Sequence, residues 1–76
     1  MPRIVEIHYR KLVKVFELDG WKFHHQRGSH LHFTKFGFKR PVTIPIYKSI
    51  PIFIIKNNLE TAKISRKRYF ELLKKS

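Results

Sequence analysis

The chain has 76 residues, of which 17 are lysine or arginine and 5 are aspartate or glutamate, so its formal net charge is +12, and it has no cysteine. A chain of this length buries only about 60% of the surface that it exposes when unfolded, so a fold of two layers fits and a deep, enclosed active-site pocket does not. The lack of cysteine excludes disulfide bonds and thiolate metal sites. No apolar run approaches the roughly 18 residues that cross a bilayer, and the N-terminus does not have the pattern of a signal peptide. We therefore expect one globular domain spanning residues 1–76, located in the cytoplasm.

The positive charge is spread along the whole chain, and it opposes folding through self-repulsion. Nucleic acid is the partner that most often compensates such a charge, because each lysine or arginine that meets a phosphate releases a counterion. An anionic membrane fits less well, because binding to its surface needs an amphipathic helix with a basic face. We therefore expect a nucleic-acid partner and no membrane; an alkaline protein without such a partner is the alternative.

The first predicted element is a helix from His8 to Leu18. Apolar residues recur there at steps of three and four, with charged residues between them, which is typical of a helix with one apolar face. Asp19 and Gly20 follow, and glycine is the usual residue at the left-handed end of a helix.

Three short runs after this helix alternate between apolar and polar residues, which is the period of half-buried strands. They cover residues 21–26, 29–34 and 41–46. We predict a tight turn at Arg27-Gly28 between the first two runs and a glycine-centred loop before the third. Pro41 and Pro45 remove backbone donors from the third run, so we expect it at an edge of the sheet.

Two further helices are predicted near the C-terminus. The stretch from Ile50 to Ile55 has the β-branched composition of a strand, but Pro51 suits the start of a helix, and apolar residues continue at helical spacing beyond it. We predict a helix from Ile52 to Ala62. Ser65 is a strong N-cap for a short last helix from Arg66 to Lys74. The predicted fold class is therefore α+β: a three-stranded antiparallel sheet with helices on one face, plus a short C-terminal helix.

Helices on one side of a sheet leave its other side in water. We expect the apolar strand residues to face the helices: Trp21, Phe23, Leu31, Phe33, Val42, Ile44 and Ile46. Alternation then places a polar set on the open face: Lys22, His24, Gln26, His30, His32 and Thr34. Because opposing side chains of adjacent strands lie about 5 Å apart, three imidazoles and an ammonium group come together there. By the same alternation His25 points inward, and we expect it and His8 to have structural roles.

An imidazole on an open, electropositive surface suits the cleavage of RNA. Its unperturbed pKa near 6.5 makes both protonation states available at neutral pH. As a base it can take the proton of a ribose 2′-hydroxyl, which then attacks the adjacent phosphorus, while a nearby lysine or arginine stabilises the charge on the phosphate. DNA lacks this hydroxyl, so the chemistry selects RNA.

Two other interpretations of these histidines compete with catalysis. A histidine on a strand surface is most often only a surface residue. A metal site formed by His24, His30 and His32 is the second alternative, but no carboxylate or thiolate accompanies them and Lys22 repels a cation, so we do not favour it.

Three motifs occur in a fixed order along these elements: Gly20-Trp21, Arg27-Gly28-Ser29-His30 and Val42-Thr43-Ile44-Pro45. Together they resemble the HicA family of toxin ribonucleases over roughly residues 8–64, where Ala62-Lys63-Ile64-Ser65 resembles the end of the family's second helix. The resemblance implies an α-β-β-β-α fold like that of double-stranded-RNA-binding domains. It implies cleavage of mRNA by the histidine of Gly-Ser-His, which is His30 here, and the imidazole chemistry described above needs no metal or cofactor. It also implies a cognate HicB antitoxin that covers the site.

The chain departs from this family at three places. Many members have a second histidine directly after the catalytic one, where this chain has Leu31, and often a histidine after the third strand, where it has Tyr47. The second helix begins with the apolar residues Ile52-Phe53-Ile54 instead of a polar step. No helper histidine is therefore carried over. We interpret the apolar helix start as an interface with the antitoxin or with a second copy in a homodimer, in preference to a more buried turn.

We expect His30 to act as general base or acid on the 2′-hydroxyl, with Gly28 and Ser29 shaping the turn that presents it. The residues expected to bind RNA are Lys22, Arg27, Gly28, Ser29, His32 and Lys35. Two alternatives come from other classes: a double-stranded RNA-binding module without catalysis, and an inactive toxin that only pairs with its antitoxin.

Overall fold

The computed structural model describes residues 3–76, which form three helices and three strands in the order α-β-β-β-α-α. The elements are α1 Tyr9–Leu18, β1 Lys22–Arg27, β2 His30–Thr34, β3 Val42–Pro45, α2 Ile52–Thr61 and α3 Arg66–Lys75. The strands form one antiparallel sheet in the order β1-β2-β3. The predicted α+β fold class and the edge position of the third strand are therefore confirmed, and residues 52–61 are helical.

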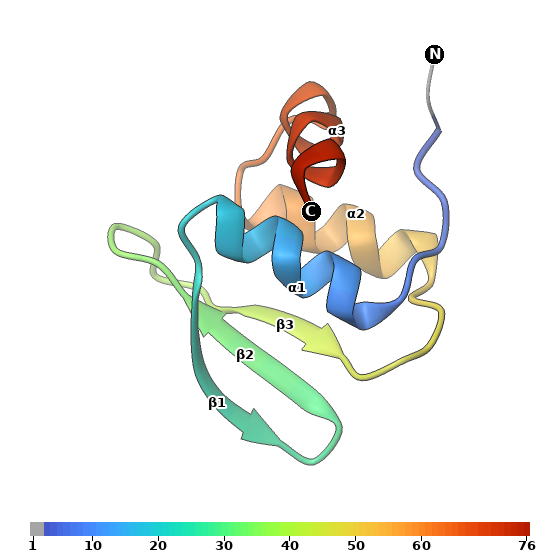
Figure 1. Ribbon diagram of the computed structural model, residues 1–76. Coiled ribbons are helices and arrows are strands. Elements are labelled where there is room, and N and C mark those ends of the chain that lie inside the picture. The colour runs from blue at the N-terminus through green and yellow to red at the C-terminus, as the bar shows by residue number, and fades with distance from the viewer. Residues whose placement is uncertain (1–2) are drawn as a thin grey trace.

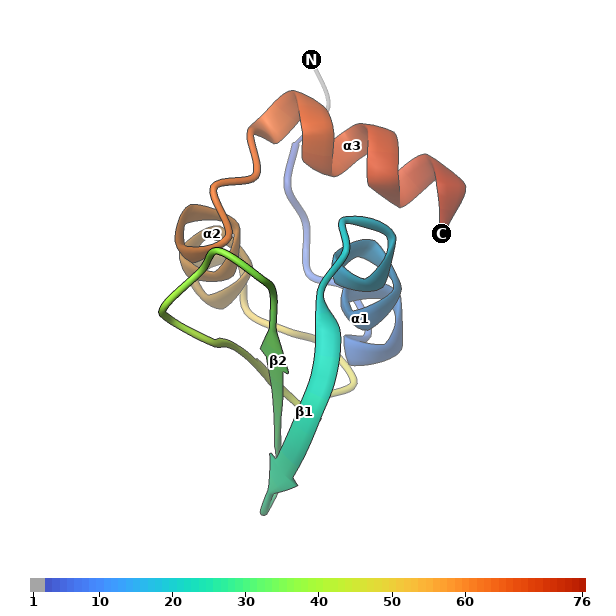
Figure 2. The same ribbon diagram turned by 90° about the vertical axis from the view of Figure 1, so that its left-hand side faces the viewer.

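The helices lie at two levels over one face of the sheet (Figure 1). α1 and α2 lie next to the strands, and both contact β3. α3 packs on α1 on the side away from the sheet, as the turned view also shows (Figure 2). It has ten residues, like α1 and α2, so the C-terminal helix is longer than expected. Within residues 3–76, no helix has the length and apolar composition needed to cross a bilayer.

The core lies between the sheet and the helices and receives side chains from all three helices, from β2 and β3, and from the connecting segments. Its members among the described residues are Leu12, Val15, Phe16, Trp21, Phe33, Val42, Ile44, Ile50, Ile55, Leu59, Ala62, Ile64, Tyr69 and Leu72. Full burial of one such aliphatic or aromatic side chain contributes about 1.5–3 kcal/mol to folding.

The β1–β2 hairpin extends past the helical layer in both views (Figures 1 and 2). All β1 residues are accordingly exposed. Phe23 was predicted to be covered by the helices, but it is 55% exposed, although its ring meets that of Phe33 edge to face at 5.9 Å. Leu31 and Ile46 are only partly buried. The prediction assumed that the helices cover the whole sheet, whereas they cover mainly its β3 side.

Local sequence explains where the helices begin and end. His8 caps α1, because its Nδ1 accepts a hydrogen bond from the backbone N–H of Arg10 at 3.1 Å, so its structural role is confirmed. Gly20, with φ +97°, follows α1 in the left-handed conformation that glycine adopts most easily. The Ser65 hydroxyl caps α3 by accepting from the backbone N–H of Arg68 at 3.1 Å, as predicted.

Asp19 links three parts of the chain just after α1. Its carboxylate accepts a hydrogen bond from the indole Nε1 of Trp21 at 3.3 Å, and it pairs with Lys35 at 3.3 Å and with Arg68 of α3 at 3.4 Å. The Asp19 side chain is only 12% exposed, and Trp21 is buried. The carboxylate therefore supplies the hydrogen-bond acceptor that a buried indole N–H needs.

We expect Asp19→Ala to lower the free energy of unfolding by about 1–3 kcal/mol, because the variant leaves the indole N–H of Trp21 without its acceptor. Lys35→Ala removes only a partly exposed ion pair and should lower the same free energy by less than about 1 kcal/mol. Urea unfolding followed by tryptophan fluorescence measures both. Equal losses in the two variants would show that the ion pair with Lys35, and not the indole hydrogen bond, accounts for the contribution of Asp19 to the free energy of unfolding.

Candidate functional site

The hairpin turn determines which side chains lie at its tip. Gly28 and Ser29 form a two-residue connection, and Arg27 pairs with His30 across it. Gly28 has φ +60°, as at the first central position of a type II′ turn, where glycine is preferred. The turn therefore lies one residue later than the predicted Arg27-Gly28, and Arg27 belongs to β1.

A bulge in β1 changes which of its side chains face outward. The pairing of β1 with β2 shifts between Phe23 and His25, so His24 has no partner on β2. Phe23 lies opposite Phe33 on the helix side, and beyond the bulge His25 lies opposite His32 on the open face. The prediction that His25 points inward is therefore wrong, because the extra residue reverses the alternation after Phe23.

Gln26 was predicted on the open face, but the same bulge places it on the other face, opposite Leu31. Its side-chain Nε2 donates a hydrogen bond to the carbonyl oxygen of Gly28 at 2.9 Å, so it supports the turn. The other five members of the predicted open face remain on it: Lys22, His24, His30, His32 and Thr34.

Three imidazoles form a cluster on the open face. The rings of His25 and His32 stack, with centroids 4.5 Å apart and planes inclined by 9°. The Nδ1 atoms of His24 and His25 are 2.7 Å apart, so one ring donates a hydrogen bond and the other accepts it. Nδ1 of His32 lies 3.1 Å from the hydroxyl oxygen of Thr43 on β3. The contacting cluster is therefore His24, His25 and His32, with His25 in the place expected for His30.

His30 lies beside this cluster at the start of β2, two residues before His32 and on the same face. Two residues along a strand correspond to about 7 Å between Cα atoms. His30 is exposed, and its partners across the sheet are Arg27 on β1 and Pro45 on β3. It is therefore open to solvent and next to a guanidinium-bearing residue, as the proposed chemistry requires.

The strands of the sheet carry positively charged residues and no acidic residue. The acidic residues of the chain all lie outside the strands: Glu6, Glu17, Asp19, Glu60 and Glu71. Lys22 and Arg27, in contrast, belong to β1. Such a surface attracts phosphate groups. Within residues 3–76, no group of three or more histidine, aspartate or glutamate side chains is arranged to hold a metal ion.

Crowding of the imidazoles affects the protonation of His25. Desolvation by its neighbours lowers the pKa of His25 below the ordinary 6.5, and the positive fields of His32, His24 and Arg27 lower it further. His25 is therefore mainly neutral at pH 7.

Lys35 lies at the other end of β2, away from the hairpin tip. Its ammonium group pairs with Asp19 and lies 5.5 Å from the centroid of the Phe38 ring. The structure thus places the motif Arg27-Gly28-Ser29-His30 at the tip of the β1–β2 hairpin. Lys35, in contrast, forms an ion pair with Asp19 just after α1. Binding of RNA by Lys35 stays a prediction.

Comparison with known proteins agrees with the motifs. A family model described as HicA toxin of bacterial toxin-antitoxin matches residues 9–64. The chain belongs to the HicA toxin family. The matched part runs from the start of α1 to just beyond α2, so it contains the whole sheet and the imidazole cluster of this HicA toxin, while α3 lies outside it. Membership of a toxin–antitoxin family implies an antitoxin partner. None of the curated proteins matches the sequence.

His25 is the residue of this HicA face that the sequence analysis missed. A signal was present, because the polar run His24-His25-Gln26 after Phe23 does not continue the alternation of apolar and polar residues. A break of this kind is typical of a bulge.

We expect the His25 imidazole to titrate below pH 6.5 in the folded protein, and His32→Ala to raise the pKa of His25, because the variant removes both the stacked ring and its positive field. His32→Phe is the matched control: it removes the charge and the hydrogen bond to Thr43 but keeps a ring for stacking, so its effect should be smaller. Histidine ring NMR signals followed from about pH 5 to 8 measure both.

The same pKa shift sets the sign of a stability change with pH. A folded-state pKa below the unfolded value means that protonation favours the unfolded chain. The stabilising contribution of neutral His25 is therefore present above pH 6.5 and is lost as the pH falls through the folded-state pKa.

For the NMR titration, a pKa of His25 that stays unchanged in His32→Ala would contradict the coupling between the stacked rings.

Proposed function

We propose that this HicA toxin is a metal-independent endoribonuclease that cleaves mRNA in the cytoplasm, with His30 as the catalytic residue that starts the reaction. The observation that carries the proposal is the position of His30: exposed on a sheet face without carboxylates, paired across the hairpin with Arg27, and on the same face as the imidazole cluster. Membership of a toxin family supports it.

The reaction begins at a ribose 2′-hydroxyl of the RNA. His30 takes its proton as general base, and the oxygen attacks the adjacent phosphorus, so that a P–O2′ bond forms while the P–O5′ bond breaks. The leaving 5′-oxygen receives a proton from a second imidazole, and we assign this role to His32, which lies on the same face about 7 Å along the strand. The products are a 2′,3′-cyclic phosphate and a 5′-hydroxyl end, and no atom is oxidised or reduced.

The residues around His30 and His32 bind the RNA and position the catalytic side chains. Arg27 lies opposite His30, where its guanidinium group stabilises the charge that develops on the phosphate oxygens. Gly28 and Ser29 form the turn that presents His30, and Lys22 extends the positive surface along β1.

His25 acts as a positioning residue and does not touch the RNA in this proposal. Its ring stacks on one face of the His32 ring, while the Thr43 hydroxyl bonds to Nδ1 of His32, so the orientation of His32 is fixed by two contacts. In this proposal the fixed ring uses its second nitrogen, Nε2, for proton transfer, since Nδ1 is bonded to Thr43. The position directly after His30 is Leu31, which faces the helix side, so a side chain there cannot orient His32 on the open face. The bulge at His24 instead brings His25 to the open face, where its ring orients His32.

The antitoxin completes the proposed function. We propose that a HicB-type antitoxin inhibits the toxin by covering the open face of the sheet, which contains every residue assigned to the reaction. Covering this face excludes RNA from His30 without any change of fold.

We expect His30→Gln and His30→Ala to reduce cleavage of a labelled single-stranded RNA by at least about 100-fold, because glutamine and alanine cannot transfer a proton. The assay contains EDTA, and circular dichroism checks that the variants fold. His8→Asn is the matched control: it removes an imidazole outside the open face and keeps a side chain able to cap α1, so cleavage should stay at the wild-type rate.

Two results would overturn the catalytic assignment. One is wild-type cleavage by His30→Gln. The other is a salt-sensitive shift of RNA by the wild-type protein without new RNA ends, which would indicate an RNA-binding module or an inactive toxin instead of an enzyme.

A further inference from the structure

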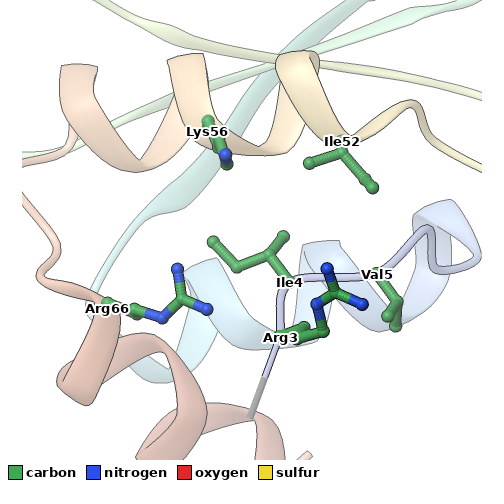
Figure 3. Close-up of a pocket in the computed structure, with 6 residues that line it drawn as sticks. All are labelled: Arg3, Ile4, Val5, Ile52, Lys56 and Arg66. Carbon is green, nitrogen blue, oxygen red and sulfur yellow. The ribbon is translucent and has the colours of Figure 1, made fainter. Parts of the chain in front are cut away.

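A groove of about 420 Å³ lies on the helical side of the molecule, between the N-terminal segment, α2 and the start of α3. Figure 3 shows it with six lining residues: Arg3, Ile4, Val5, Ile52, Lys56 and Arg66. Ile52 and Lys56 project from α2 on the side turned away from the strands (Figure 3). The groove is therefore separate from the open sheet face that carries His30.

Positive charge reaches the groove from three separate parts of the chain. Arg3 comes from the N-terminal segment, Lys56 from α2 and Arg66 from the first position of α3. None of the six lining residues that the structure describes is acidic. A carboxylate in the groove would meet three cations within one small space, which favours an anionic partner.

The rest of the lining is aliphatic and partly exposed. Ile52 is 38% exposed, and Phe53, which follows it in the first turn of α2, is 64% exposed. Val5 is also exposed and also lines the groove. Apolar side chains gathered next to a charged hollow are typical of a surface that binds another protein.

Aliphatic lining and charge together select among possible partners. A single RNA strand is bound mainly by stacking of its bases on aromatic rings, and among the residues from 3 to 76 none that lines this groove is aromatic. A second copy of the chain would bring another +12 of net charge toward the three cations, so repulsion opposes it. A peptide segment with both carboxylates and aliphatic side chains matches both parts of the lining.

We propose that this groove binds an acidic segment of the antitoxin in which carboxylates alternate with aliphatic side chains. The proposal rests on membership of the toxin–antitoxin family and does not depend on ribonuclease activity. It gives the antitoxin a second contact on the helical side, in addition to the sheet face. It also gives a role to Ile52 in the apolar first turn of α2, because this side chain lines the groove and is 38% exposed.

Fluorescence anisotropy with a dye-labelled peptide of alternating glutamate and leucine tests the groove directly. Two peptides serve as controls, one with glutamine in place of glutamate and one with glycine in place of leucine. We expect the wild-type protein to bind the glutamate–leucine peptide more tightly than either control. Lys56→Glu should weaken this binding by about tenfold or more.

The matched protein control is Lys14→Glu, which makes the same change of charge at an exposed position of α1 outside the groove. It should weaken peptide binding by less than about threefold, because only the overall charge of the protein changes. Circular dichroism verifies that both variants fold. Unlabelled cognate antitoxin should displace the labelled peptide from the wild-type protein.

Several outcomes would overturn the proposal. Equal weakening by the two lysine variants would show that the peptide responds only to overall charge. Equal binding of the glutamine–leucine peptide would show that the cations have no role. Displacement of the peptide by single-stranded RNA, or binding of antitoxin that leaves the peptide in place, would assign the groove to another occupant. None of these readings depends on RNA cleavage, so the outcome stands whether or not the toxin proves to be a nuclease.

Discussion

The packing of α1 and α2 against one face of the sheet is the constraint on which the rest of the structure depends. Because Phe33, Val42 and Ile44 enter the core from that face, the side chains that alternate with them on β2 and β3 must face water. The packing of the core therefore places His30 and His32 on the open face, in addition to the preference of their polar side chains for water. It also separates two positively charged surfaces, the open sheet face, where we propose that RNA binds, and the groove on the helical side, where we propose that an acidic partner segment binds.

Elements whose signals are local could be predicted from the sequence. Ser65 supplies a cap for the helix that follows it, Gly20 ends the helix before it, and apolar spacing beyond Pro51 decides between helix and strand for the next segment. The exposure of Phe23 could not be predicted in this way. It depends on how far the helical layer reaches along the hairpin, which is a property of the assembled fold and of no single segment.

The outward position of His25 shows a different limit. In a regular hairpin with a two-residue turn after Arg27, His25 pairs with His32 on the open face, and Phe23 then pairs with Thr34, also on the open face. The apolar character of Phe23 favours the opposite face. Both preferences are met only if one extra residue is inserted, and His24 is that residue. The conflict could be found by counting from the turn, but the turn was placed one residue too early. The imidazole cluster is therefore a consequence of a bulge, which is indicated by the break in alternation after Phe23 together with the correct position of the turn.

The central claim is that a histidine on this face moves the proton of a ribose 2′-hydroxyl. The most direct test compares a single-stranded RNA with the same strand carrying one 2′-deoxy nucleotide at the cleaved position, in EDTA, with the products identified by mass spectrometry. The account predicts a 2′,3′-cyclic phosphate and a 5′-hydroxyl end from the unmodified strand, and no cleavage at the 2′-deoxy position. Cleavage at the 2′-deoxy position, or a 5′-phosphate end from the unmodified strand, would contradict it, because neither can arise from attack by the neighbouring 2′-oxygen.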